Sequence, residues 1–214
     1  LSVVKDSKGG WTYSFAGNRE KLISASRLGY AGANGETIPA ANWKVTSKKR
    51  RHDGVWKPVW GKREQVADKY NELTLTFTAP KGSRGLATIE MVFRAYDDGV
   101  AFRYVVPQEQ TDSVKVSREL TQYAFAGDYI SWFYNGENHN LGPDKLSEVD
   151  GNRLPVMTIK AGENQYMAVH EADLAEGEPL VLNSRAGEST FEVSSKPGML
   201  KSGYASAWRV LFYG

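Results

Sequence analysis

Residues 91–106, which read MVFRAYDDGVAFRYVV, constrain the fold more than any other part of the chain. β-branched and aromatic residues fill this stretch, and its side chains alternate with period two on both sides of Asp97-Asp98-Gly99. Asp tolerates left-handed backbone and Gly supplies positive φ, as a short hairpin loop requires. The stretch therefore predicts a β-hairpin. Because it is apolar on both faces, and isolated hairpins are marginal in water, we expect it deep within a larger sheet.

Strand-like segments separated by turn residues make up most of the remaining chain. The clearest is residues 70–78, where Leu73, Leu75 and Phe77 alternate with threonines. Helix signals are almost absent, and no linker marks a boundary. We therefore predict one all-β domain over residues 1–214, a large antiparallel two-sheet sandwich. Further strands are expected at residues 11–15, 21–26, 43–47, 86–95, 114–119, 156–160, 166–170, 180–183 and 190–193.

Two segments are expected to be loops. The basic run at residues 48–51 is interpreted as part of a solvated loop that continues to residue 61, with an anion contact as the alternative. Residues 135–152 contain several Gly and Pro and few apolar residues, and they are the best candidate for a long functional loop.

Composition excludes several classes of site. The absence of cysteine excludes disulfides, zinc-thiolate sites, iron–sulfur clusters and cysteine nucleophiles. A net charge of +2, with both signs interspersed, argues against nucleic acid as the main partner. No apolar run approaches the roughly 20 residues of a membrane-spanning helix. We therefore expect neither a nucleic-acid partner nor a membrane span.

Residue patterns alone do not identify a catalytic site. Phosphate-loop, zinc-protease, nucleophile-elbow and EF-hand motifs are missing. Glycoside hydrolysis needs two carboxyl groups on opposite sides of one bond, and no spacing singles out such a pair. His52, His139 and His170 are scattered singly and are interpreted as structural. The compact acidic group at residues 171–173 follows an apolar strand. By pattern alone it is interpreted as a solvated strand end.

A family resemblance adds to this interpretation. The segments PVWGKR at residues 58–63, YNEL at 70–73, FRAYDDGVAFRY at 93–104, EADL at 171–174 and WRV at 208–210 resemble the N-terminal domain of glycoside hydrolase family 97. The resemblance implies a galactose-mutarotase-like β-super-sandwich that precedes a catalytic (β/α)₈ barrel in bacterial α-glucosidases and α-galactosidases. The catalytic carboxylates would lie on that barrel, which is absent from this chain. No activity is therefore expected for this chain alone.

The resemblance also implies the site residues. Glu171 matches a glutamate that reaches a calcium ion in the active site of the full enzyme. Asn71, Glu72 and Trp132 are candidate contacts to an α-linked gluco- or galacto-oligosaccharide. For Asn71 and Glu72 the alternative is hydrogen bonding to loop backbone at a strand start, and for Trp132 it is packing. A periplasmic or secreted location is implied as well.

The two arginines of the hairpin and three tryptophans can also be given structural roles instead of substrate contacts. Arg94 and Arg103 are expected to pair with acidic neighbours such as Asp97 or Glu90. Trp56 and Trp60, like Trp132, could stack on a sugar ring or pack in the core or between domains.

Three functions remain open at this point. The chain could be the non-catalytic N-terminal domain of a calcium-dependent exo-acting glycosidase, which packs on its own barrel, shapes the active-site rim and lends Glu171. It could instead be an independent carbohydrate-binding module, which an exposed tryptophan pair would favour. It could also be an interaction domain without a sugar role. An exposed apolar face with Glu171 at its edge would favour the first function.

Overall fold

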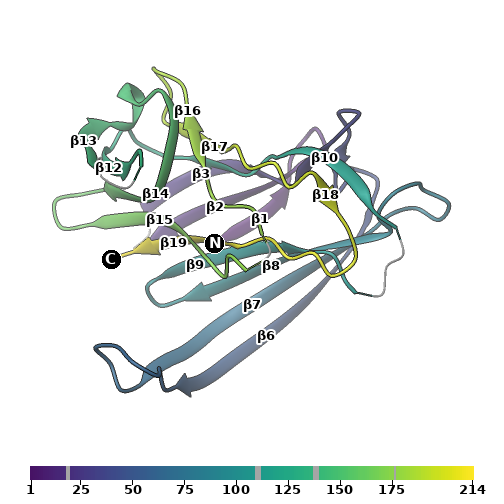
Figure 1. Cartoon of the computed structure of the whole chain (residues 1–214), viewed down its shortest axis with the longest axis horizontal. Coiled ribbons are helices and arrows are strands. Elements are labelled where there is room, and N and C mark those ends of the chain that lie inside the picture. Colours follow the sequence, from purple (N-terminus) through teal and green to yellow (C-terminus); the bar gives the residue numbers. More distant parts are fainter. Residues whose placement is uncertain (18–19, 109–111, 137–139, 176) are drawn as a thin grey trace.

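The computed structural model describes residues 1–17, 20–108, 112–136, 140–175 and 177–214. These residues form β-strands and one short 3₁₀ turn, η1 (Leu146–Glu148), and the domain is all-β as predicted (Figure 1). The strands are β1 (Ser2–Lys5), β2 (Trp11–Gly17), β3 (Glu20–Leu28), β4 (Tyr30–Gly32), β5 (Thr37–Ile38), β6 (Lys44–Trp56), β7 (Val66–Thr78), β8 (Thr88–Tyr96), β9 (Gly99–Val105), β10 (Val114–Glu119), β11 (Gln122–Ala124), β12 (Ile130–Tyr134), β13 (Asn140–Lys145), β14 (Gly151–Lys160), β15 (Tyr166–Ala172), β16 (Leu182–Ser184), β17 (Thr190–Val193), β18 (Met199–Leu200) and β19 (Trp208–Tyr213).

One large sheet dominates the domain. Its strands follow the order β11-β17-β16-β14-β15-β19-β9-β8-β7-β6, and β12 and β13 join it beside β14. Neighbouring strands are antiparallel throughout the order. The late strand β19 therefore lies between β15 and the hairpin strand β9, although about a hundred residues separate β9 from β19 in the chain.

Two smaller sheets cover one face of the large sheet. They are β1-β2-β3 and β18-β10-β4-β5. Aromatic side chains join the layers. The ring centroids of Tyr13 of β2 and Phe102 of β9 are 5.1 Å apart, and those of Tyr30 of β4 and Tyr104 of β9 are 4.8 Å apart. Such ring pairs add specific contacts to the burial of apolar area. We call the covered side of the large sheet the inner face and the opposite side the outer face.

The predicted hairpin is confirmed, but the role of its glycine differs from the expectation. β8 and β9 pair from Glu90↔Val105 to Tyr96↔Gly99, in the middle of the large sheet. Neither Asp97, Asp98 nor Gly99 has a positive φ. Instead, a Cβ on Gly99 would lie 2.3 Å from the carbonyl oxygen of Leu211. Gly99 is required because the backbone of β19 approaches it closely, not because of the turn conformation.

Both loop predictions were wrong in part. The basic run at residues 48–51 is exposed as expected, but it lies within the long edge strand β6, which continues to Trp56. Residues 135–152 contain β13, η1 and the start of β14, so this segment is mostly regular structure. Residues 137–139, and with them His139, lie outside the described residues.

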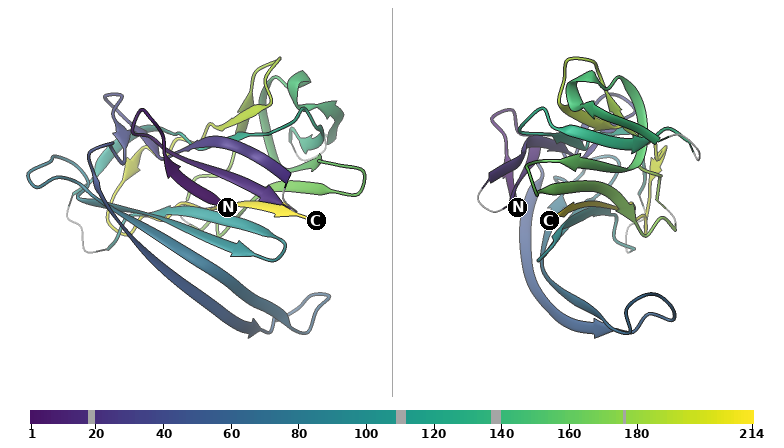
Figure 2. Two further views of the ribbon diagram at one scale, coloured as in Figure 1. Left: turned by 180° about the vertical axis from the view of Figure 1, so that it is seen from behind. Right: turned by 90° about the vertical axis from the view of Figure 1, so that its left-hand side faces the viewer.

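The end of the β6–β7 ribbon projects beyond the sheet. β7 pairs with β8 only from Asn71 onward, whereas the β6–β7 pairing continues from His52↔Tyr70 to Trp56↔Val66. We call residues 52–70 the arm. In the right-hand view of Figure 2 the sheet curves through β7 and β6 as an open arc, with β1–β3 on its convex side. The outer face is therefore concave.

No helix in the described ranges is long and apolar enough to cross a membrane.

Replacing Gly99 tests the close approach of β19. Gly99→Ala should lower the free energy of unfolding by about 1–3 kcal/mol, because the added methyl group meets backbone atoms that cannot rotate away. Gly162→Ala is the matched control, since its Cβ would meet only the flexible side chain of Gln165. Chemical denaturation of both variants measures the difference. Equal stability of the two variants would show that β19 can shift to accept the methyl group.

Candidate functional site

A buried arginine lies at the centre of the candidate site. Arg209 and Leu211 alternate with Val210 on β19, so Arg209 points to the inner face with the apolar core. Its side chain is fully buried. An unpaired charge at such a position would be very costly, so the fold must supply a partner.

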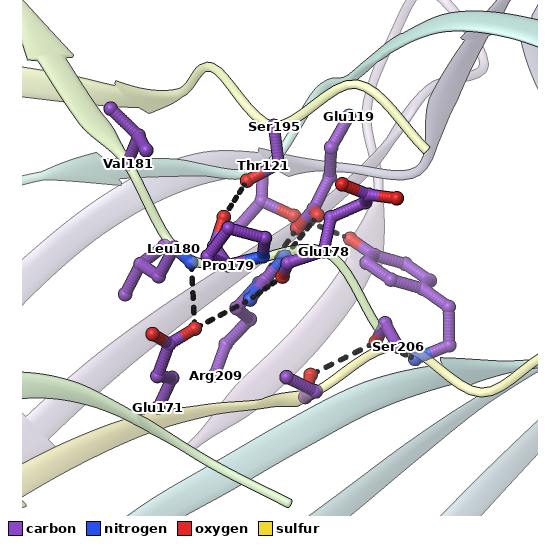
Figure 3. A network of polar contacts seen from close by, with 12 residues as sticks. Glu119, Thr121, Glu171, Glu178, Pro179, Leu180, Val181, Ser195, Ser206 and Arg209 are labelled. Carbon is purple, nitrogen blue, oxygen red and sulfur yellow. Dashed lines mark hydrogen bonds and ion pairs between the residues drawn. The ribbon is translucent and has the colours of Figure 1, made fainter. Parts of the chain in front are cut away.

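Glu119, at the end of β10, is that partner. The Nη2 group of Arg209 donates a hydrogen bond to Oε2 of Glu119 at 2.6 Å, and Nε donates to Oε1 at 3.2 Å (Figure 3). This bidentate ion pair joins the large sheet to the smaller sheet that contains β10. Burial lowers the pKa of Arg209, but the adjacent Glu119 carboxylate more than offsets this, so the pKa lies above its ordinary value.

Glu171 approaches the same guanidinium from β15. Its Oε2 lies 3.7 Å from Nη1 of Arg209 and accepts a hydrogen bond from the Leu180 backbone N–H at 2.6 Å (Figure 3). Both contacts use Oε2, and Oε1 takes part in neither. Since Glu119 already compensates Arg209 at shorter distances, the three ionised side chains carry a net charge of −1. Glu171 is thus held in position through its Oε2 by Leu180 and Arg209.

The other carboxylate of the Glu171 motif belongs to a residue with left-handed backbone. Asp173 has a φ of 59°, the one positive φ of a non-glycine residue in the described part of the chain. β15 ends at Ala172, and the Asp173 carboxylate pairs with Nη1 of Arg103 at 3.1 Å. Arg103 points to the outer face. The two acidic residues therefore do not form a joint carboxylate site.

Stacked aromatic and guanidinium groups cover part of the outer face. The Arg94 guanidinium lies 4.2 Å from the ring centroid of Tyr70 and 4.6 Å from that of Trp208, and Arg103 lies 4.5 Å from Trp208. Each stack adds a cation–π attraction. Beside them is a hollow of about 310 Å³, lined among others by Tyr96, Trp208 and Phe212.

The arginines of the hairpin form ion pairs as expected, but with other partners. Arg94 Nε donates to Oε2 of Glu72 at 2.9 Å, and Arg103 pairs with Asp173. Neither uses Asp97 or Glu90. Cross-strand register explains the first pair, because Glu72 of β7 lies directly opposite Arg94 of β8.

The three candidate substrate residues are not brought together. Asn71 and Glu72 lie within β7 rather than at a strand start, and they point to opposite faces. Both residues nevertheless line one hollow of about 520 Å³ beside β1, which does not include Trp132. Glu72 is engaged by Arg50 at 3.0 Å and by Arg94, which makes its role an ion pair rather than a loop-backbone contact.

Trp132 lies on β12, in the cross-strand row that runs through Thr158 and Ala168 to Phe212. It is half-buried and lines a separate hollow of about 200 Å³. Glu171 points instead to the inner face. The structure therefore offers no single pocket that contains all four predicted residues.

This chain could supply only part of a calcium site. Calcium takes six to eight oxygen ligands, and one carboxylate furnishes at most two. Within the described residues no three or more acidic or histidine side chains are grouped to hold a metal ion. The carboxylate of Glu171 suits a cation, but the remaining ligands would have to come from elsewhere.

Sequence patterns did not identify Arg209 and Glu119 as a functional pair. No local signal marked the pair, because Trp208, Val210 and Phe212 alternate with Arg209, and by pattern alone these three apolar side chains would face inward. The partner of Arg209 could not be read from the sequence, because Glu119 is 90 residues away.

Comparison with known proteins identifies the domain. The sequence model described as "Glycosyl-hydrolase 97 N-terminal" matches residues 1–214, which is the whole chain. This chain belongs to the glycoside hydrolase 97 N-terminal family. A retaining alpha-galactosidase from Bacteroides thetaiotaomicron is 26% identical over 205 residues, which cover 87% of this chain and 29% of that protein. A probable retaining alpha-galactosidase from Streptomyces bingchenggensis is 29% identical over 113 residues, or 52% of this chain and 15% of that protein.

Solved structures share the fold of this family 97 domain. A glycoside hydrolase family 97 enzyme from Pseudoalteromonas sp. strain K8, solved in complexes with panose and with acarbose, superposes with a TM-score of 0.82 at 23% identity. The match covers 100% of this chain and 34% of that one. A beta-arabinopyranosidase gives a TM-score of 0.80 at 19% identity, covering 100% of this chain and 38% of that one. The family 97 domain thus spans less than two fifths of the length of these relatives.

Removing the charge of Glu119 tests the buried ion pair. Glu119→Gln should lower the free energy of unfolding by about 3–5 kcal/mol, because Arg209 then keeps only the more distant Glu171 as a charged partner. Glu163→Gln, at an exposed turn, is the control and should change stability by less than about 0.5 kcal/mol. Denaturant titration measures both. A loss below about 1 kcal/mol for Glu119→Gln would mean that Arg209 is compensated by another route.

Proposed function

We propose that this chain is the non-catalytic N-terminal domain of an exo-acting family 97 α-glycosidase, and that it packs on the catalytic (β/α)₈ barrel of the same polypeptide. The observation that carries the proposal is the family match over residues 1–214, together with relatives that are much longer than this chain. An alpha-galactosidase and an enzyme solved with panose among the relatives support an α-linked gluco- or galacto-oligosaccharide as the substrate of the full enzyme. A periplasmic or secreted location belongs to the same proposal and rests on the family resemblance.

The outer face supports packing against a further domain. Phe212 is 45% exposed on β19. Val210 and Ala101 lie in the same cross-strand row between β19 and β9. Partly exposed apolar side chains on a concave sheet are typical of a surface that another domain covers.

Glu171 is proposed to donate one carboxylate ligand to calcium at the active-site rim. The Leu180 N–H and Arg209 hold Oε2, and Oε1 has no part in these contacts. Calcium prefers oxygen ligands, and the cluster around Glu171 has net negative charge. Bound calcium would supply a positive charge that polarises the substrate or positions the catalytic carboxylates. Glu171 points to the inner face one residue before the end of β15, so calcium would have to meet it at that end of the strand, beside the packed outer face rather than on it.

A specific observation also favours the second candidate, an independent carbohydrate-binding module. Trp56 and Trp60 are 53% and 87% exposed at the end of the arm. Exposed indole rings can stack on the apolar face of a pyranose. This pair is distant from Glu171 in the fold and is considered separately below.

Neutralising Glu171 tests the proposed calcium ligand. In the full-length enzyme, Glu171→Gln should lower calcium affinity and activity, because the amide keeps the shape and the hydrogen bond to Leu180 but removes the charge. Added calcium should restore part of the activity. Calorimetric calcium titration and turnover of aryl α-glycosides measure the two effects.

Asp173→Asn is the matched control for this experiment. It lies in the same motif but pairs with Arg103 on the outer face, so calcium affinity should stay unchanged. If Glu171→Gln binds calcium as tightly as the wild type, Glu171 is only a partner of Leu180 and Arg209.

The isolated 214-residue chain should hydrolyse no glycoside. The paired carboxylates of such chemistry are proposed to lie on the barrel. Purified chain is assayed with aryl α-glucoside and α-galactoside in excess calcium. Turnover that persists through purification and disappears on mutation of a residue of this chain would contradict the non-catalytic assignment.

A further inference from the structure

The arm, residues 52–70, is supported by the neighbouring strand β8 mainly at its base, where Tyr70 contacts Arg94 and Tyr96. Its strands pair only with each other, because β8 pairs with β7 no further than Asn71. β6 is also the edge strand of the large sheet. A two-stranded ribbon alone is marginally stable in water, and a long exposed edge invites pairing or covering by another chain segment.

Apolar side chains are concentrated at the end of the arm. Val55 and Trp56 are 58% and 53% exposed at the end of β6, and Val59 and Trp60 are 99% and 87% exposed in the loop that follows. Exposed apolar patches of this kind mark interaction sites in soluble proteins. The two valines contribute apolar area without hydrogen-bonding groups, which suits a protein surface better than a sugar with its many hydroxyl groups.

Two ion pairs lie within the arm, whereas Lys57, Lys62, Arg63 and Glu64 near its end take part in neither of them. Lys69 Nζ lies 2.9 Å from Oδ1 of Asp53, and His52 Nε2 lies 3.1 Å from Oδ2 of Asp68. His52 also stacks on Tyr70 at 5.0 Å. These two pairs need no charged partner from outside, so contact by the arm would depend on its end, where the exposed apolar side chains lie.

The arm continues the concave outer face. Figure 2 shows β6 and β7 curving around the side of the sheet that is opposite β1–β3. The partly exposed Phe212 lies on this same face. The outer face of the sheet and the arm therefore form one continuous concave surface, which we call the cradle.

We propose that the arm clasps the remaining part of the same polypeptide, with Trp56, Val59 and Trp60 inserted against an apolar patch of the catalytic domain. This inference rests on the proposed function, because it requires a longer parent chain. The domain covers only 29% of the Bacteroides relative and 34% of the Pseudoalteromonas enzyme, so in such a parent ample chain is available to fill the cradle. Burial of three large apolar side chains would also stabilise the ribbon beyond its supported base.

Thiol labelling of the full-length parent enzyme tests the clasp. This domain contains no cysteine, so Val59→Cys, Phe212→Cys and Val4→Cys each introduce its sole thiol. Val59→Cys reports on the arm and Phe212→Cys on the outer face of the sheet. Val4→Cys is the control, since Val4 is 53% exposed on β1, on the opposite side of the domain. Labelling rates are read from peptide masses, which separate these sites from any cysteines elsewhere in the parent.

The expected result is that Val59→Cys and Phe212→Cys react at least about tenfold more slowly than Val4→Cys, because labelling then requires local opening. Slow labelling of Phe212→Cys with fast labelling of Val59→Cys would overturn the clasp but leave the proposed domain packing intact. Fast labelling of both would overturn both. Fast labelling of Val59→Cys that slows when panose is added would overturn the clasp and assign the arm to sugar binding.

Discussion

The ion pair between Arg209 and Glu119 is the constraint on which the rest of the structure depends. It is fully buried and joins the central strand β19 to β10 of the covering layer. A buried pair gains little over apolar packing, but loss of one partner is strongly destabilising. The pair therefore fixes how the two layers are placed relative to each other, more than it adds to their total stability.

The same ion pair determines how the Glu171 side chain is oriented. Because Glu119 compensates Arg209 at 2.6 Å, Glu171 at 3.7 Å is oriented by the guanidinium without being neutralised by it. The Leu180 N–H completes this orientation. The left-handed backbone of Asp173 then places its own carboxylate beside Arg103 on the outer face. One short acidic motif thus serves two faces of one sheet.

Curvature of the large sheet gives the domain its second functional feature. The outer face carries stacked arginine and aromatic groups at its centre and a projecting ribbon at its edge. Its central arginines are paired within the domain, whereas its exposed large side chains, such as Phe212 and Trp60, are apolar. This distribution fits a surface that is stable in this domain alone. In the full enzyme another part of the chain would cover it, as the proposed function requires.

The sequence by itself determined the all-β class and the central hairpin, because period-two alternation is a local property of each strand. The same alternation predicted that Leu73, Leu75 and Phe77 lie on one face of their strand. Only the tertiary structure decided that Arg209 meets Glu119, that Gly99 is needed for the approach of β19, and that β6 continues through the basic run. Each of these depends on which distant strands become neighbours, and strand order is set by packing over the whole chain rather than by any local pattern.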